Sequence, residues 1–175
     1  VEKGTYVLNP VSTILSNRHK FYLQQLEQDG INIIPTVFVP STESFSIPTI
    51  VANQWNKAVI KPAVSAGSYL TKVFTADEAD TIEKEYSTIA RERDLLIQPF
   101  LPEVISNGEI SLLYFNRQFS HAVLKTPKQG DFRVQQEFGG HTVAYTPTAE
   151  TLQAADNILQ KTEGELLYAR VDGVI

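Results

Sequence analysis

The spacing of apolar and polar residues predicts a chain built of both helices and strands. Apolar residues recur at helical spacing over 16–29, and Gly30 stands where such a helix would end. The stretch 31–40 is rich in β-branched residues but is broken by Pro35, which favours an edge strand or an irregular extended segment. The polar residues 41–48 are predicted to form a linker.

Residues 57–100 show a strand, a loop, a strand, a helix and a strand in succession. Two short apolar runs, AVIKP and YLTKVF, flank a loop of small residues, which predicts two strands joined by that loop, the second beginning at Tyr69. Thr75 and Glu78 have the spacing of a capping box, and the helix that they begin is predicted to continue to about Arg93. The apolar run 94–100 predicts a buried strand. The region is therefore predicted to form a compact β-β-α-β unit.

The rest of the chain predicts a hairpin, a long loop, a helix and a last strand. The hairpin covers 109–125, with its turn at Asn116-Arg117. Polar residues and glycines fill 126–140, and loops of that length inside a compact domain usually carry function. A Thr-Pro pair then marks the start of an amphipathic helix, and the apolar residues 166–175 close the chain as a strand.

Composition and charge narrow the class of protein. The chain has 175 residues, of which 42% are hydrophobic and 20% charged, as is typical of a globular protein and not of a disordered one. No apolar run approaches the roughly 18 residues that cross a bilayer, so we expect no membrane partner. The net charge of -5 opposes a general attraction to phosphate backbones, so we expect no nucleic-acid partner. The first residues lack the features of a signal peptide, and a cytoplasmic location is expected.

Two residue types, Cys and Met, are missing from the chain, and the absence of Cys excludes several kinds of site. Without Cys the chain has no disulfide, no thiolate zinc site and no cysteine nucleophile. Its three His residues lack metal-ligand spacing, and no G-x-S-x-G elbow occurs. There is no Met, even at position 1, and the sequence stops within a predicted strand. We therefore expect a piece of a longer protein.

Lys61 stands at the end of a predicted strand, directly before Pro62 and a loop of small residues that includes 65–68. Such a strand end would hold the ammonium in a fixed place, and small side chains would let backbone N–H groups approach phosphate oxygens. A surface lysine beside an ordinary hairpin loop explains the same pattern. Because no Walker-type spacing is present, the second interpretation is favoured on these residues alone.

Further candidates follow in the last third of the chain. Lys125 ends the predicted hairpin and points either to a site or to solvent, while Arg133 in a glycine-flanked loop suits bidentate capture of a carboxylate or phosphate. A solvated loop charge explains Arg133 equally well. Arg170 and Asp172 have period-2 spacing in an apolar strand, so both project from one face. A Mg²⁺ carboxylate beside a charge-stabilising arginine is favoured there over a structural ion pair.

Taken in order, AVIKP with its small-residue loop, LIQPFLPE, GEISLLYF, VLKTPKQGDFRVQQEFGG and ARVDGV resemble the ATP-grasp superfamily. The resemblance is closest to its bacterial glutathione synthetase and ribosomal-protein glutamate ligase branch, and to related cyclo-ligases. It implies an α+β, ATP-grasp fold, with a small β-β-α-β lid subdomain over 57–100. A central subdomain with a partial antiparallel sheet and helices would cover 101–175, and 1–56 would lead into this core.

The resemblance implies that one group of residues contacts the phosphates of ATP: Lys20, Lys61, Ser65, Ala66, Gly67 and Ser68. Lys61 would also lie near the adenine, and the loop 65–68 would close over the phosphates.

The resemblance places a second group at the adenine and the ribose. Gln98, Phe100 and Leu101 match the hinge segment that edges the adenine, in part through backbone groups. Glu109 matches the acidic ribose ligand, with Glu103 as its substitute.

The resemblance gives a third group roles in the reaction. Lys125 would approach the terminal phosphates, and Arg133 the acyl phosphate or the substrate carboxylate. Arg170 would stabilise the tetrahedral intermediate, and Asp172 would be the first Mg²⁺ ligand.

An ATP- and Mg²⁺-dependent carboxylate–amine ligase is therefore the implied activity. A small carboxylate and an amine would be the partners, and a homodimer is left open. The family has a further metal-binding strand after the Asp172 position and a domain before this region, so we expect this chain to bind ATP but catalyse poorly. A non-catalytic nucleotide- or partner-binding module and an ATP-dependent phosphoryl transferase are the alternatives.

Overall fold

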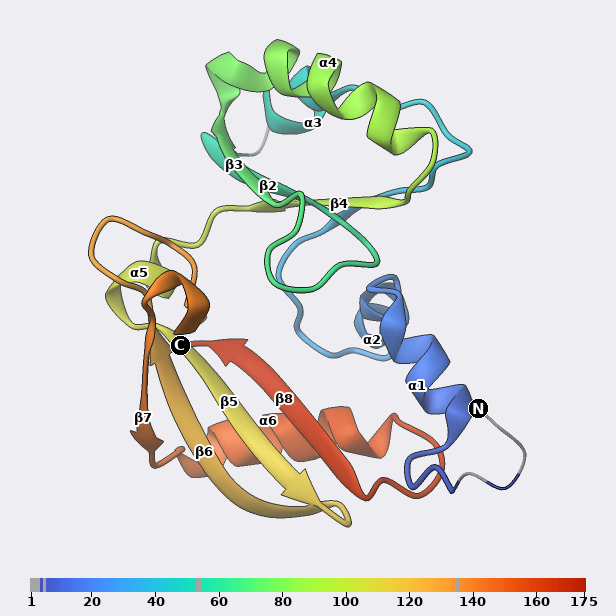
Figure 1. Cartoon of the computed structure of the whole chain (residues 1–175), viewed down its shortest axis with the longest axis vertical. Helices are drawn as coiled ribbons and strands as arrows, with labels where there is room; N and C mark the ends of the chain where they lie inside the picture. The colour runs from blue at the N-terminus through green and yellow to red at the C-terminus, as the bar shows by residue number, and fades with distance from the viewer. Residues whose placement is uncertain (1–3, 5, 53–54, 135) are drawn as a thin grey trace. The chain divides into compact units, whose positions relative to one another are not determined.

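Two four-stranded sheets, both antiparallel, organise the computed structural model (Figure 1). The structure describes residues 4, 6–52, 55–134 and 136–175. Its helices are α1 (Val11–Arg18), α2 (Tyr22–Gln28), α3 (Ile47–Ala52), α4 (Ala79–Ala90), α5 (Glu103–Ser106) and α6 (Ala149–Gln160), with 3₁₀ turns η1 (Ala76–Glu78) and η2 (Gln136–Phe138). Its strands are β1 (Val37–Val39), β2 (Lys57–Pro62), β3 (Lys72–Thr75), β4 (Leu95–Pro99), β5 (Glu109–Phe115), β6 (Gln118–Thr126), β7 (His141–Tyr145) and β8 (Tyr168–Val174). The predicted α+β class is confirmed.

The chain divides into two compact units, each with one sheet. Residues 19–100 form the first, here called the β2–β4 unit, with strand order β1-β4-β2-β3. Residues 1–18 and 101–175 form the second, the β5–β8 unit, with strand order β7-β6-β5-β8. In the described part of the chain, no helix combines the length and the apolar character needed to cross a bilayer.

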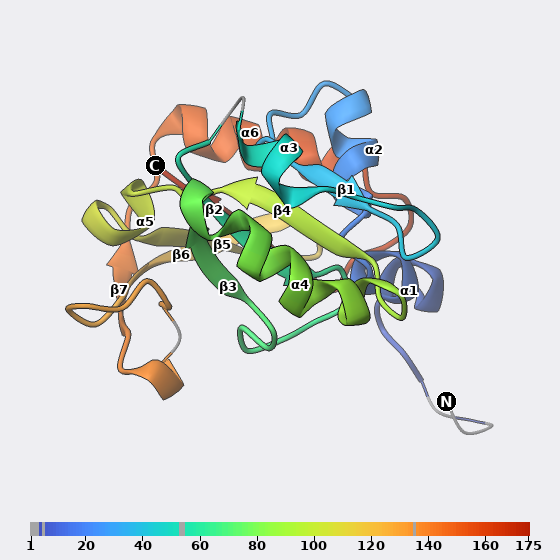
Figure 2. The ribbon, with the colours of Figure 1, turned by 90° about the horizontal axis from the view of Figure 1, so that it is seen from above.

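In the β2–β4 unit, helices α3 and α4 pack on one face of the sheet (Figure 2). Ile60 of β2 and Ile97 of β4 are fully buried there, against Ile82 and Tyr86 of α4. Because side chains alternate along a strand, the intervening residues of β2 and β4 point to the opposite face, which these helices do not cover.

In the β5–β8 unit, α6 packs on one face of the sheet (Figure 1). Ile110, Leu112 and Tyr114 of β5 are buried against Ala155 and Leu159 of α6. The intervening β5 residues therefore point to the opposite face, which α6 does not cover.

The local signals in the sequence are mostly confirmed. Thr75 and Glu78 form the predicted capping box, with the Thr75 N–H donating to the Glu78 carboxylate over 2.8 Å. Asn116 and Arg117 make the hairpin turn, with φ values of 49° and 60°. Gly30 follows α2 with a φ of 81°, as a helix-ending glycine does. β1 is the edge strand that was predicted.

Two predicted boundaries are wrong. The expected helix over 16–29 is divided between α1 and α2, because the backbone N–H of Lys20 donates to the Ala63 carbonyl over 3.0 Å and not within a helix. The expected linker over 41–48 contains the start of α3, because Ile47 is fully buried and its N–H donates to a Glu83 carboxylate oxygen over 2.6 Å.

Three smaller differences concern the ends of elements and one extra strand. β3 begins only at Lys72, because Ser68 and Leu70 have left-handed backbone angles that a strand does not admit. Helix α4 ends at Ala90, before Arg93. β7 was not predicted, since its side chains are mostly exposed and it is defined by its pairing with β6.

Candidate functional site

Charged and polar side chains of three neighbouring strands meet on the face of the β5–β8 sheet that α6 leaves uncovered. The register sets Glu109 of β5 opposite Lys125 of β6, and Ser111 of β5 opposite Asp172 of β8. Arg170 lies two residues before Asp172 and shares its face, as predicted. We call Glu109, Ser111, Lys125, Arg170 and Asp172 the carboxylate–lysine cluster.

Short polar contacts connect the whole carboxylate–lysine cluster. The Lys125 Nζ lies 3.0 Å from Glu109 Oε1 and 3.7 Å from Asp172 Oδ1. The hydroxyl of Ser111, which is 0% exposed, donates to Asp172 Oδ1. Arg170 donates from Nε and Nη2 to Asp172 Oδ2, over 3.0 and 2.9 Å. Asp172 is therefore held by partners on β5 and β8, with Lys125 of β6 close by.

The guanidinium of Arg170 and the carboxylate of Asp172 form an ion pair that is partly exposed to solvent. Burial alone would lower the pKa of the Arg170 guanidinium, but its hydrogen bonds to Asp172 raise that pKa above its ordinary value. The side chains of Arg170 and Asp172 are 48% and 37% exposed. Both groups can therefore exchange their mutual contact for contacts with a charged ligand.

Two carboxylates of the cluster suit a Mg²⁺ ion. Glu109 and Asp172 both lie within 4 Å of the Lys125 ammonium, so their oxygens are neighbours. In proteins Mg²⁺ typically takes one or two carboxylates and completes its shell with water and substrate phosphates. Residues 4, 6–52, 55–134 and 136–175 contain no group of three or more His, Asp or Glu suited to a metal. The two carboxylates thus suit a Mg²⁺ ion that substrate phosphates also bind. They do not suit an ion that is bound by protein side chains alone.

Arg133, which was predicted to capture a carboxylate or phosphate, holds a carboxylate of its own loop. Its Nε and Nη2 donate to the two oxygens of Asp131 over 3.0 and 2.7 Å. Its guanidinium carbon lies 3.8 Å from the centre of the Phe138 ring. The hydrogen bonds from Arg133 hold the pKa of Asp131 well below its usual range. This ion pair organises the loop 126–140, and a substrate anion at Arg133 would compete with Asp131.

The loop after β2 presents backbone N–H groups that are open to an anion. Gly67, Ser68 and Leu70 have φ values of 57°, 57° and 50°, in the left-handed region. Among the described residues, none accepts a hydrogen bond from the N–H groups of 65–68. Successive N–H groups in turns of this kind form concave sites for anions. Ala66 and Gly67 are exposed, and since the first has only a methyl group and the second no side chain, the backbone there is accessible.

Lys20 stabilises the start of this loop. Its Nζ lies 3.3, 3.3 and 3.1 Å from the carbonyl oxygens of Pro62, Ala63 and Ser65, and 3.0 Å from the Ser65 hydroxyl. Burial lowers the pKa of this ammonium. The lysine thus holds the strand end and the loop together, and its contact with ATP phosphates stays a prediction.

We expect Lys20→Met to lower the free energy of unfolding by about 1–2 kcal/mol without any nucleotide, because the loop carbonyls lose a charged donor. Urea denaturation followed by far-UV circular dichroism measures the change. Lys84→Met, at an exposed position of α4, is the matched control and is expected to change stability little. A lysine that serves only a phosphate would leave the stability of the ligand-free protein unchanged.

Tyr86 of α4 holds the other end of the loop. Its hydroxyl donates to the Leu70 carbonyl over 2.9 Å, and burial, with a contribution from Glu85, raises the pKa of Tyr86 to about 12. Leu70 is one of the left-handed residues. The loop is therefore fixed at both ends, and its exposed middle carries the open N–H groups.

The face of the β2–β4 sheet opposite α3 and α4 carries Lys61 and Gln98. Lys61 pairs with Leu96 across the strands, and Gln98 pairs with Val59. Gln98 is 5% exposed and donates from Nε2 to Thr36 Oγ1 over 2.8 Å.

The predicted site residues fall in both compact units. The β2–β4 unit contains Lys20, Lys61, Ser65, Ala66, Gly67, Ser68, Gln98 and Phe100, the last with the Lys57 ammonium 4.2 Å from its ring centre. The β5–β8 unit contains Leu101, Glu103, Glu109, Lys125, Arg133, Arg170 and Asp172. Within the second unit, the structure joins Glu109, Lys125, Arg170 and Asp172 in one cluster, while Arg133 has other partners.

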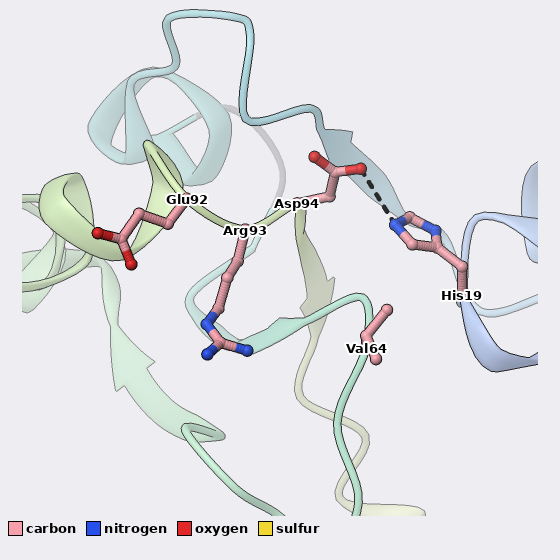
Figure 3. Close-up of a pocket in the computed structure, with 5 residues that line it drawn as sticks. All are labelled: His19, Val64, Glu92, Arg93 and Asp94. Carbon is pink, nitrogen blue, oxygen red and sulfur yellow. Dashed lines mark ion pairs between the residues drawn. The ribbon is translucent and has the colours of Figure 1, made fainter.

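A shallow pocket of about 260 Å³ in the β2–β4 unit contains none of the predicted site residues (Figure 3). The His19 Nε2 lies 3.1 Å from Asp94 Oδ2 there, with Val64, Glu92 and Arg93 around them. Burial alone would raise the pKa of Asp94, but hydrogen bonds from the Ser41 N–H and from His19 lower it below its usual value. The pocket is lined by both acidic and basic side chains, and none of these side chains has a buried polar atom without a hydrogen-bond partner. Its lining therefore indicates no particular class of ligand.

The sequence of the chain is similar to those of a known family. A family model described as "Prokaryotic glutathione synthetase, ATP-grasp domain" matches residues 19–172. The chain belongs to this ATP-grasp family. A glutathione synthetase of Nitrosomonas europaea is 25% identical over 169 residues, which are 96% of this chain and 49% of that protein. The chain thus spans about half the length of this curated relative.

Solved ATP-grasp ligases share the fold. The crystal structure of D-cycloserine synthetase DcsG superposes with a TM-score of 0.81 at 20% identity, over 96% of this chain and 61% of that one. D-alanine–D-alanine ligase from Bacillus anthracis gives a TM-score of 0.68 at 15% identity, over 95% and 55%. The same ligase has been solved with ATP, and the ATP-grasp ligase PsnB with Mg and ADP. The ATP-grasp fold is confirmed, and ATP-grasp ligases use ATP and Mg²⁺.

Sequence reasoning missed three polar residues that support the site. Ser111 orients Asp172, Thr36 contacts Gln98, and Tyr86 holds the loop after β2. Ser111 carried a usable signal, since a small hydroxyl residue interrupts the apolar strand EISLLYF. The other two depend on contacts between elements far apart in the sequence.

Proposed function

We propose that the chain is the ATP-binding core of a carboxylate–amine ligase that uses ATP and Mg²⁺. The observation that carries this proposal is the carboxylate–lysine cluster, in which Asp172 lies beside Lys125 and Arg170 on an uncovered sheet face. Membership of the ATP-grasp family supports it.

In the first step, an oxygen of the substrate carboxylate attacks the γ-phosphorus of ATP. The bond from that phosphorus to the β,γ-bridging oxygen breaks, which yields an acyl phosphate and ADP. The backbone N–H groups of 65–68 bind phosphate oxygens, and Lys125 neutralises charge on the terminal phosphates. Asp172, with Glu109 nearby, would hold Mg²⁺, which neutralises phosphate charge when it is bound.

In the second step, the amine attacks the acyl carbon and inorganic phosphate leaves. Negative charge develops on the acyl oxygen at this point, and Arg170 stabilises it as a fixed cation. Arg133 binds the acyl phosphate or the substrate carboxylate in exchange for Asp131. The nitrogen releases a proton to solvent as the amide forms.

Isothermal titration of the chain with ATP, with and without Mg²⁺, tests the binding part of the proposal. We expect weak binding that strengthens when Mg²⁺ is present. Equal heats with and without Mg²⁺ would remove the metal from the proposal.

ADP release by the full-length parent protein tests the reaction. The parent is assayed against a panel of amino-acid and peptide carboxylates, with and without amines. Release that needs both a carboxylate and an amine supports the ligase. Binding of ATP with no turnover on any pair would instead indicate a non-catalytic nucleotide-binding module.

A further inference from the structure

The side chain of Gln98 is buried in the middle of a sheet and has one hydrogen-bonded partner. Val37 of β1 pairs with Ile97 of β4, so continuing this register by one residue sets Thr36 opposite Gln98. The Gln98 Nε2 donates to Thr36 Oγ1 over 2.8 Å. This bond is the only hydrogen bond of the Gln98 side chain among the described residues.

The hydroxyl of Thr36 determines which way the amide of Gln98 points. It donates to the Ile34 carbonyl over 2.6 Å. A hydroxyl has a single hydrogen, so once that hydrogen is given to Ile34 its oxygen can only accept a second bond. The Gln98 group that faces Thr36 must therefore be the amide NH₂. The carbonyl oxygen Oε1 is consequently directed away from Thr36.

The Gln98 Oε1 is an acceptor that has no partner among the described residues and is not fully buried. Among the described residues, only the Tyr114 hydroxyl is a side-chain polar atom that is fully buried and has no hydrogen-bond partner. Since Oε1 has no partner and is not among such atoms, it retains access to solvent. It belongs to the sheet face that also carries Lys61 and that α3 and α4 do not cover.

We propose that Thr36 is a positioning residue that sets the base preference of the nucleotide site by fixing Gln98 as a hydrogen-bond acceptor. This inference rests on the proposed function, in which Gln98 borders the base. Adenine carries an exocyclic NH₂ group that can donate to Oε1. Guanine carries an oxygen at the same ring position, which would meet Oε1 acceptor to acceptor. With its amide fixed, Gln98 favours ATP over GTP.

Thr36→Val tests this role, because valine has nearly the shape of threonine but no hydroxyl. The Gln98 amide is then free to turn its NH₂ group toward the base. In that orientation it can donate to the oxygen of guanine, so GTP can bind. Competition of ATP and of GTP against a fluorescent ATP analogue gives both dissociation constants for the chain. We expect the ratio of the GTP constant to the ATP constant to fall about tenfold in Thr36→Val. Thr36→Ser keeps the hydroxyl and is expected to keep the ratio.

The ratio of the two dissociation constants distinguishes this role from a general loss of structure. A general loss of structure would weaken the binding of ATP and of GTP to the same extent and leave the ratio unchanged. Should Thr36→Val not fold, Thr36→Ala removes the hydroxyl with less bulk, and the same fall in the ratio is expected. An unchanged ratio in a folded variant that lacks the hydroxyl overturns the inference while the proposed function stands. If the unmodified chain binds neither nucleotide, the proposed function is wrong and the inference falls with it.

Discussion

Asp172→Asn is expected to reduce ADP release by the parent protein by at least about a hundredfold, because it removes the charge that the proposed Mg²⁺ ion and Arg170 both face. Asparagine keeps the shape of the side chain, and its amide oxygen can still accept from Ser111. The change therefore removes the negative charge and, because an NH₂ group replaces Oδ2, the acceptor of the two hydrogen bonds from Arg170. ADP release at saturating ATP and Mg²⁺, on the best carboxylate and amine pair, measures the loss.

The control for Asp172→Asn is the same substitution at Asp156, an exposed position of α6 on the other face of the sheet. We expect Asp156→Asn to retain its turnover. Thermal unfolding of Asp172→Asn should lie close to that of the unmodified protein, since the Asp172 ion pair is partly exposed and such pairs contribute little to stability. Turnover retained by Asp172→Asn would remove this residue from the mechanism.

The composition of the cluster could be partly predicted from the sequence. Period-2 spacing correctly predicted that Arg170 and Asp172 share a face, whereas it left open whether Lys125 points to a site or to solvent. What the sequence could not give is the register. Lys125 and Asp172 lie on strands that do not pair with each other, and their 3.7 Å approach depends on β5 between them. A shift of one residue in either pairing would turn one of them to the α6 side.

Elements that depend on distant contacts were the ones that sequence reasoning missed. Helix α3 begins in a segment whose composition is typical of a linker, and its first N–H donates to Glu83 of α4, far along the chain. Ile47 and Val51 have helical spacing and are buried, but two apolar residues in a polar segment are a weak signal. The break between α1 and α2 likewise depends on Ala63.

The hairpin turn shows a role that its local signal did not reveal. Asn116-Arg117 was predicted as a turn, and both residues adopt left-handed backbone angles. The Arg117 guanidinium also reaches the connection between α6 and β8. It donates to the carbonyl oxygens of Leu159, Thr162 and Gly164 over 2.6, 2.5 and 2.5 Å. The last carbonyls of a helix lack partners within the helix, and a cation there also meets the negative end of its dipole.

Arg117→Ala is therefore expected to destabilise the β5–β8 unit by about 2–4 kcal/mol, as several charge-assisted hydrogen bonds are lost together. Urea denaturation followed by far-UV circular dichroism measures the change. Arg117→Lys keeps the charge but lacks the planar, forked donors of the guanidinium that these carbonyls meet, so we expect it to recover only part of the loss. Asn116→Gly changes the other left-handed residue of the turn and is expected to be neutral or slightly stabilising.

The only tryptophan helps to assign where Arg117→Ala acts. Trp55 packs against the core of the β2–β4 unit, so its fluorescence follows that unit, whereas circular dichroism follows both. If Arg117 acts through the α6–β8 connection, the circular dichroism transition should move to lower urea and the Trp55 transition should move less. Equal stability of Arg117→Ala and the unmodified protein would mean that water replaces the guanidinium at these carbonyls at no cost. An equal displacement of both transitions would instead show that the two units unfold as one.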